Sequence, residues 1–594
     1  MAKESISGKA LDRSTLKRLI AYVKPHRVAF LTALGLTILL AIVGPFRPVL
    51  VQQILDGPVA TGNGGLLRTM ILALLLLLLV EGVLMYANTY MTSWLGQSII
   101  KDIRKQVFDH ILRLRLSFFD RTPIGTLQTR TISDIETLND VFSSGLVRIL
   151  GQLLQLFAIV GFMFYTSWDL ALVVLTTLPL LIMATIIFKN KVKVSFQAVR
   201  KSVSDMNAFL QEHLSGMNII HIFNREKKEM DRFLLINDQL RKANLNSVMY
   251  YSVYFPVIEI ITALGMGILV WYGSGRVMQG ELQFGELVAF IMFLQMFFRP
   301  LRTLADQFNM LQLGMVSAER IFKILDTREF ITNEGKLEQL PKLENVSEKA
   351  VSVSFHDVSF AYKEPEWVLK NINFQVEAGQ KLALVGSTGS GKTTIINLLS
   401  RFYEIQKGEI KVNGTDIKEY TLDSLRSLTG VVLQDVFLFS GSIYDNITLN
   451  NPDIPLDQVK EAAKQVGAHE FIMKLPGGYD YKVRERGATL SLGQRQLIAF
   501  ARVMTYDPKV LVMDEATANI DTESEEIIQQ AIETVMTGRT SIMIAHRLST
   551  IQAADQILVL NRGNIIESGN HKQLMELKGA YYQLHQKQFA GVGH

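Results

Sequence analysis

The sequence contains no cysteine in its 594 residues. Disulfide bonds, zinc–thiolate sites, iron–sulfur clusters and a catalytic cysteine are therefore excluded. Charge is also scarce, since only 20% of the residues are Asp, Glu, Lys or Arg, and the formal net charge is only +5. A balance this small gives no reason to expect a nucleic-acid partner. Residues 1–27 are polar and basic and contain no short apolar core, so a removable signal peptide is not expected.

What is abundant is apolar sequence, and it concentrates before residue 300. A bilayer core needs ~20 mostly apolar residues per helix, and six segments meet that need. The predicted spans are residues 28–50, 70–94, 149–166, 170–188, 253–272 and 284–301. The last is the weakest because Glu286 and Arg299 flank a short apolar run. A basic amphipathic stretch at residues 12–24 predicts an elbow helix on the inner membrane surface.

Lys and Arg gather in alternate loops: before the first span, between spans two and three, and between spans four and five. Because Lys and Arg mark cytoplasmic loops, the pattern predicts a multi-pass protein with both termini in the cytoplasm. The two long cytoplasmic loops show helical spacing, as in Ile100, Ile103, Val107, Ile111 and Leu114. We therefore expect the helices to continue out of the membrane into the cytoplasm.

The second half has the composition of a soluble domain. Polar residues 327–350 predict a linker between a membrane domain at 1–326 and a second domain at 351–594. An apolar strand, the loop Gly386-Ser-Thr-Gly-Ser-Gly-Lys-Thr393 and a helix start follow in the order of a P-loop. Its glycines let N–H groups converge on phosphates, while Lys392 and the Thr393 hydroxyl suit phosphate and magnesium. The motif predicts an α/β NTPase that uses ATP and Mg²⁺.

Two further apolar strands end in residues suited to phosphate chemistry. Residues 510–513 lead into Asp514 and Glu515, where one carboxylate can hold magnesium and the next can polarise an attacking water. Residues 540–545 lead into His546. A lone histidine is usually structural, but this position at a strand end favours contact with the γ-phosphate.

Here the chain resembles ABC transporters. Leu490-Ser-Leu-Gly-Gln494 resembles their LSGGQ signature and lies between the P-loop and Asp514, as in that family. Gln434 resembles the Q-loop, Ala518-Asn-Ile-Asp521 the D-loop, His546 the switch histidine, and Tyr362 the aromatic that stacks on adenine. Residues 118–130 and 212–226 resemble the two intracellular loops of multidrug-type exporters.

The resemblance implies a half-transporter: an all-α six-helix transmembrane domain with long cytoplasmic extensions, followed by the ATPase domain. The implied nucleotide contacts are Tyr362, Gly386, Ser387, Thr388, Gly389, Ser390, Gly391, Lys392, Thr393, Thr394, Ser491, Gly493, Gln494 and Asp521. The implied catalytic residues are Glu515, His546, Gln434 and Lys392, and the magnesium ligands are Thr393, Gln434 and Asp514. Two ATPase domains would close head to tail, each ATP lying between one P-loop and the partner's signature.

The signature has Leu492 where the family usually has its first Gly, and the D-loop reads Ala-Asn-Ile-Asp rather than Ser-Ala-Leu-Asp. These variants resemble the catalytically competent half of some heterodimeric exporters, yet no required group is missing. The expected partner is therefore a second half-transporter chain, with a homodimer favoured over a heterodimer.

The expected activity is ATP-driven export of amphiphilic small molecules, and a flippase for lipids or lipid-linked glycans is the alternative. Glu81, Glu259 and Arg299 lie within spans, where ionisable groups face a cavity or pair structurally. Aromatic residues of the last two spans either line a substrate cavity or pack between helices. The architecture favours a prokaryotic inner membrane, with membrane lipids as further partners.

Overall fold

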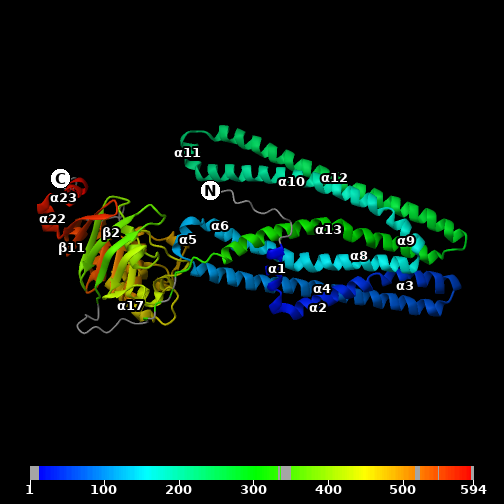
Figure 1. Cartoon of the computed structure of the whole chain (residues 1–594), viewed down its shortest axis with the longest axis horizontal. Helices are drawn as coiled ribbons and strands as arrows, with labels where there is room; N and C mark the ends of the chain where they lie inside the picture. The colour runs from blue at the N-terminus through cyan, green and yellow to red at the C-terminus, as the bar shows by residue number, and fades with distance from the viewer. Residues whose placement is uncertain are drawn as a thin grey trace. The chain divides into compact units, whose positions relative to one another are not determined.

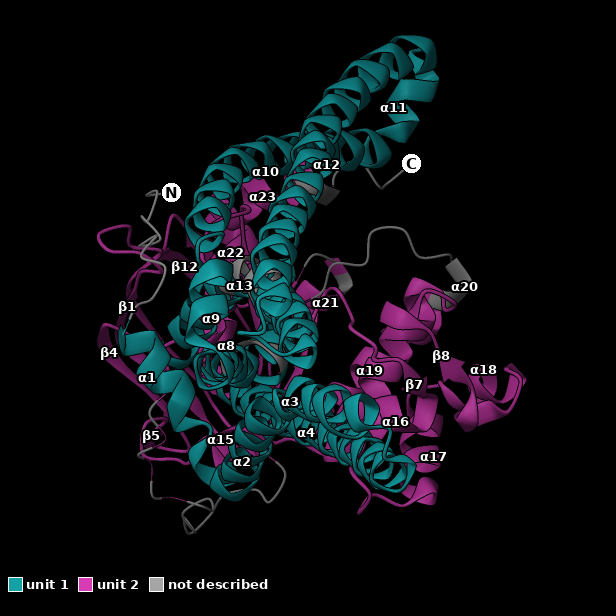
Figure 2. Cartoon of the chain, turned by 90° about the vertical axis from the view of Figure 1, so that its right-hand side faces the viewer, with its two compact units in different colours: residues 1–112, 124–327 teal, residues 113–123, 328–594 magenta. Residues whose placement is uncertain are grey.

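The computed structural model describes residues 13–331, 333, 335, 337, 350–514, 522–545 and 548–589. The chain divides into two compact units, shown in different colours in Figure 2. Unit 1 comprises residues 1–112 and 124–327, and unit 2 comprises residues 113–123 and 328–594.

Unit 1 is helical. Its α-helices are α1 (Arg13–Ala21), α2 (Arg27–Val43), α3 (Phe46–Ile54), α4 (Gly64–Arg113), α6 (Ile124–Thr129), α7 (Ile135–Asp140), α8 (Leu146–Thr166), α9 (Trp168–Leu175), α10 (Leu178–Ser215), α11 (Met217–Ile222), α12 (Glu226–Met278) and α13 (Phe284–Leu325). Short 3-10 or π-helical turns link some of them: η1 (Lys24–His26), η2 (Leu55–Val59), η3 (Arg130–Asp134) and η4 (Val141–Gly145).

The longest helices far exceed the thickness of a bilayer. Helix α4 has 50 residues and α12 has 53. At a rise of ~1.5 Å per residue such helices are ~75–80 Å long, against a hydrocarbon core of ~30 Å. Figure 1 shows α10 and α12 running side by side, joined at one end by α11. The predicted continuation of the membrane helices beyond the bilayer is confirmed.

Five helical stretches among the described residues are long and apolar enough to cross a membrane. They are Lys24–Val59, Gly64–Arg113, Ile124–Thr166, Trp168–Ser215 and Glu226–Met278, and they contain the first five predicted spans. The sixth predicted span, residues 284–301, forms the first part of α13 but falls outside this set. It stays a prediction.

Two expected spans are each built from two helices rather than one. Residues 28–50 break between α2 and α3, where Pro45 is the N-cap of the second helix. Residues 170–188 break between α9 and α10, with Pro179 in the first turn of α10. Proline has no N–H to donate to the preceding turn, which ends the first helix. At the second break the buried Thr177 hydroxyl donates to the carbonyl of Val174 at 2.7 Å.

Aromatic residues of α13 form much of the core of unit 1. Phe290, Phe293, Phe297 and Phe298 are almost completely buried, and they pack with apolar residues of α8, α9 and α12. In the single chain these four rings therefore serve helix packing. Phe255 of α12, by contrast, is 54% exposed.

Unit 2 is an α/β domain. Its described strands are β1 (Val353–Phe360), β2 (Leu369–Val376), β3 (Lys381–Gly386), β4 (Lys407–Val412), β5 (Thr415–Asp416), β6 (Thr429–Val432), β7 (Gly441–Ser442), β8 (Lys482–Val483), β9 (Val510–Asp514), β10 (Thr540–Ile544), β11 (Gln556–Asn561) and β12 (Asn564–Gly569). Its α-helices are α5 (Leu116–Arg121), α14 (Lys392–Leu399), α15 (Leu422–Leu428), α16 (Ile443–Thr448), α17 (Leu456–Gln465), α18 (His469–Lys474), α19 (Leu492–Tyr506), α20 (Thr522–Met536), α21 (Leu548–Gln552), α22 (His571–Leu577) and α23 (Ala580–Phe589), with 3-10 turns η5 (Gly478–Asp480) and η6 (Glu485–Gly487).

The larger sheet has the strand order β12-β11-β3-β10-β9-β6. Strands β11, β3, β10, β9 and β6 are parallel, and β12 pairs with β11 antiparallel. The middle strands β3, β9 and β10 are almost entirely buried, as expected for parallel strands covered on both faces. A smaller antiparallel sheet has the order β2-β1-β4-β5. These sheets confirm the predicted α/β domain.

Candidate nucleotide site

The strands that lead to the P-loop, Asp514 and Gln434 lie in the larger sheet. In the register of the parallel strands, Ile544 of β10 pairs with Leu384 of β3 and with Asp514 of β9. On the far side of β9, Val432 of β6 pairs with Met513. The P-loop, Asp514 and the segment that leads to Gln434 therefore leave the sheet at the carboxyl ends of neighbouring strands. Ligands of open parallel α/β sheets bind at this edge.

Two positions of the P-loop admit only glycine. Gly386 has φ +152°, and a Cβ there would lie 2.3 Å from the carbonyl oxygen of Leu560. Gly391 has φ +107° and is the N-cap of α14, and a Cβ there would lie 2.5 Å from the side chain of Leu369. Glycine allows the left-handed turn and the close packing of the loop on β11 and β2. The turn sets the N-terminus of α14 at the sheet edge.

Lys392 is the first residue of α14, and its side chain is folded back over the loop. Its ammonium donates hydrogen bonds to the carbonyls of Gly386 at 2.8 Å and Ser387 at 3.0 Å. Burial lowers the pKa of Lys392, and attraction to Asp514 opposes that shift. The ammonium thus lies within electrostatic reach of the carboxylate that ends β9.

The rest of the loop has the donors that a triphosphate and its magnesium require. Ser387, Thr388 and Gly389 are exposed, and so is Thr393 in the first turn of α14. Ser390 is 1% exposed, and its hydroxyl oxygen has no hydrogen-bond partner among the described residues. Thr393, Asp514 and the exposed Gln434 supply oxygen atoms, the ligand type that Mg²⁺ prefers. The residues present therefore fit ATP and its magnesium ion.

Tyr362, the predicted adenine contact, is half exposed beside the P-loop helix. Its hydroxyl lies 3.2 Å from that of Thr394, whose side chain is buried below the loop. Its ring packs edge-on against Phe360, with centroids 4.8 Å apart, and against Tyr403, with centroids 5.0 Å apart. Tyr403 carries no sequence signal of its own, because it lies in the loop between α14 and β4 and meets Tyr362 only in the folded domain.

The signature segment begins a regular helix. Ser491 is the N-cap of α19 and forms a capping box with Gln494, in which each side chain accepts the other residue's N–H. Leu492 occupies the first helical position, so the departure from the usual glycine leaves the start of the helix intact. Ser491 is exposed at the helix N-terminus, where the helix dipole favours an anion, and Gly493 is buried.

Several predicted residues lie outside the described residues: Glu515, His546, Asp521 and the rest of the D-loop at 518–520. Their roles stay predictions. Of the ionisable residues predicted within spans, Glu81 lies in α4 and is half-buried, whereas Glu259 of α12 and Arg299 of α13 are exposed in the single chain.

Comparison with known families assigns both halves of the chain. Residues 30–301 match the ABC transporter transmembrane region, and residues 369–518 match the ABC transporter family. The second match includes the P-loop, the signature and Asp514.

Relatives match along most of the chain. An uncharacterized ABC transporter ATP-binding protein, YknV of Bacillus subtilis (strain 168), is 38% identical over 99% of this chain and 97% of its own length. A probable multidrug resistance ABC transporter ATP-binding/permease protein of that bacterium, YheH, is 40% identical over 85% of this chain and 74% of its own length. An ATP-dependent lipid A-core flippase of Syntrophus aciditrophicus (strain SB) is 34% identical over 96% of this chain and 94% of its own length. The chain therefore belongs to the ABC transporter family, as a multi-pass half-transporter whose transmembrane region is fused to an ATPase domain that powers export.

Proposed function

We propose that the chain exports amphiphilic or hydrophobic small molecules by alternating access, as a homodimer. The observation that carries the proposal is the union, in one chain, of membrane-length apolar helices with a nucleotide site at the edge of the larger sheet. The substrate class is supported by the likeness to YheH, whose name describes a probable multidrug resistance transporter.

The proposed chemistry uses residues of both partners. Lys392 and the P-loop amides bind the β- and γ-phosphates, and Tyr362 stacks on adenine. Thr393, Asp514 and Gln434 would hold magnesium, which would supply positive charge to offset that of the transferred phosphoryl group. Glu515 polarises the attacking water, and His546 and Gln434 respond to the γ-phosphate. The partner's signature closes the site with Ser491 and Gly493 at the N-terminus of α19.

A dimer is required because the chain carries a single P-loop and a single signature segment. If each ATP lies between one chain's P-loop and the partner's signature, two copies of this chain form two complete sites. We place both termini in the cytoplasm, because the basic residues concentrate in the loops on that side. The bacterial relatives support a prokaryotic inner membrane.

A second candidate is a flippase for a lipid or a lipid-linked glycan. It is favoured by the likeness to the lipid A-core flippase, which extends over 96% of this chain. The two candidates share the ATP site and the dimer, and they differ only in the substrate that the membrane domain accepts.

The first test is ATP hydrolysis by this chain purified alone in lipid nanodiscs, with Glu515→Gln as the control. Robust turnover that the substitution abolishes, while ATP binding persists, would support a homodimer with Glu515 as the water-polarising residue. ATP binding without turnover by the native chain would contradict the homodimer and point to a missing companion chain. Undiminished turnover by Glu515→Gln would contradict the role of Glu515.

The second test separates the substrates in one preparation of proteoliposomes. ATP-driven uptake of a fluorescent amphiphilic amine is compared with ATP-driven loss of a fluorescent lipid from one leaflet, using Glu515→Gln vesicles as the blank. Amine transport alone supports small-molecule export, and lipid movement alone supports the flippase and overturns the first proposal.

A further inference from the structure

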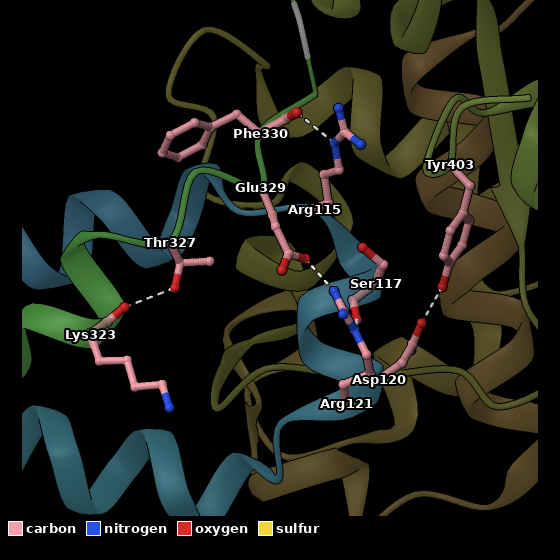
Figure 3. A network of polar contacts seen from close by, with 9 residues as sticks. All are labelled: Arg115, Ser117, Asp120, Arg121, Lys323, Thr327, Glu329, Phe330 and Tyr403. Carbon is pink, nitrogen blue, oxygen red and sulfur yellow. Dashed lines mark hydrogen bonds and ion pairs between the residues drawn. The ribbon is translucent and has the colours of Figure 1, made fainter. Parts of the chain in front are cut away.

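Helix α5 belongs to the ATPase unit although it follows the membrane helix α4 directly in the chain. Residues 113–123 form part of unit 2, together with residues 328–594. Arg115 fixes the start of α5. Its backbone N–H donates to the carbonyl of Glu329 at 2.8 Å. Its side-chain Nε donates to the carbonyl of Phe330 at 2.5 Å, as Figure 3 shows. At the other end of α5, Arg121 forms an ion pair with the carboxylate of Glu329.

A further contact of α5 leads toward the proposed ATP site. The hydroxyl of Tyr403 donates a hydrogen bond to the carboxylate of Asp120 in α5, as Figure 3 shows. Burial raises the pKa of Tyr403 well above its usual range, and the bond to Asp120 adds to the rise. The phenol therefore stays protonated and keeps donating at neutral pH.

The ring of Tyr403 packs against the ring of Tyr362. The two rings meet edge to face at an angle of 89°, with their centroids 5.0 Å apart. The ring of Phe360 packs against both rings, with its centroid 4.8 Å from that of Tyr362 and 5.8 Å from that of Tyr403. The Tyr362 hydroxyl is fixed in turn by Thr394 at 3.2 Å and by the side-chain amide of Asn397 at 3.4 Å. Both of these residues belong to the P-loop helix α14.

A continuous set of contacts thus runs from α5 to the residue proposed to stack on adenine. We propose that Tyr403 is a positioning residue. Held by Asp120, it fixes the orientation of the Tyr362 ring, and it thereby couples the position of α5 to the affinity of the site for the adenine base. The inference rests on the proposed role of Tyr362. Such coupling is reciprocal. ATP binding therefore favours the docked position of α5 by the same factor by which docked α5 raises the affinity for ATP.

This route differs from sensing of the γ-phosphate, because it depends on the base. ADP, which has the same adenine, is expected to engage it as ATP does, whereas inorganic tripolyphosphate is not. The distinction provides a readout that a general loss of structure would not reproduce.

The experiment measures binding of ATP, ADP and tripolyphosphate to the full chain in nanodiscs by calorimetry. Tyr403→Phe removes only the hydroxyl and is expected to weaken ATP and ADP about fivefold, or about 1 kcal/mol, with tripolyphosphate unchanged. The matched control is Tyr506→Phe, which removes a hydroxyl that donates to the carbonyl of Thr448 at 2.6 Å in α16. Its affinities for all three ligands are expected to stay unchanged.

Asp120→Asn is the second variant, and it leaves every side chain of the ATP site in place. Asp120→Asn is expected to reproduce the selective loss of affinity for ATP and ADP. The double variant with Tyr403→Phe is expected to bind ATP no more weakly than either single variant. Unchanged ATP affinity in both single variants, or an equal loss for ATP and tripolyphosphate, would overturn the inference.

A parallel measurement on Tyr362→Ala separates failure of the inference about Tyr403 from failure of the proposed adenine contact of Tyr362. If Tyr362→Ala weakens ATP but not tripolyphosphate, while Tyr403→Phe and Asp120→Asn have no effect, only the role of Tyr403 is wrong. If Tyr362→Ala has no effect on ATP, the proposed adenine contact itself is wrong.

Discussion

At the scale of single residues, the proposed ATP site depends on how the side chain of Lys392 is held. Lys392 is 9% exposed, and its ammonium donates hydrogen bonds to two carbonyls of its own loop. It also interacts electrostatically with Asp514. The side chain is therefore already ordered over the position that the phosphates are proposed to occupy. A preorganised cation needs little rearrangement to stabilise the charge that develops during phosphoryl transfer.

Lys392→Met keeps most of the length of the side chain and removes the charge. We expect kcat/KM for ATP to fall about 100-fold or more, because one preorganised electrostatic contact to the phosphates is lost. The check is steady-state ATP hydrolysis in nanodiscs, with Lys370→Met, which neutralises an exposed lysine of β2, as the control. Turnover within tenfold of the native protein would contradict the role of Lys392.

At the scale of elements, one helix is capped by a residue from another part of the chain. The N-cap of α13, Gln283, makes no side-chain capping bond. Instead Asp56, in the π-helical turn η2, accepts the N–H of Gly285 at 2.6 Å. Gly285 leaves the space for this contact, since a Cβ there would lie 2.6 Å from the carboxylate. The bond links η2 to the start of α13.

Asp56→Ala is expected to destabilise unit 1 by about 1–2 kcal/mol, because it removes the acceptor at the start of α13. Asp56→Asn keeps an acceptor oxygen and should cost less. Gly285→Ala should also destabilise the protein, since the added methyl group displaces the carboxylate. Thermal unfolding of the three variants in detergent tests this order. Equal stability of Asp56→Ala and the native chain would show that the bond contributes nothing.

At the scale of the whole molecule, function is proposed to need two chains, and this can be tested by complementation. Lys392→Met disables a chain's own P-loop, and Ser491→Arg blocks the signature that it offers to its partner. A mixed dimer of the two variants contains one doubly disabled site and one intact site. We expect each variant alone to be inactive and the co-expressed pair to regain a substantial part of the ATPase activity. A pair as inactive as its members would contradict composite sites.

The sequence by itself determined the domain types and predicted the residues of the proposed ATP site. Strand-forming apolar runs followed by Gly386-to-Thr393, Asp514 and the segment around Ser491 identify the chemistry locally, because backbone turns and phosphate contacts need particular residues at fixed spacing. Apolar length likewise indicates membrane helices, since each must satisfy its own backbone in lipid. Apolar length did not reveal that two spans break into separate helices, although Pro45 and Pro179 mark the two breaks in the sequence.

The tertiary structure alone decided the contacts between residues far apart in the chain. Asp56 caps a helix that begins more than two hundred residues later, and Asp120 meets Tyr403 only after α5 joins the ATPase unit. Neither pair has a local signal, because an aspartate or a tyrosine fits many surface positions equally well. The phenylalanines of α13 likewise became core residues only when the neighbouring helices packed around them. Such pairings depend on how elements pack, and no spacing along the chain encodes that.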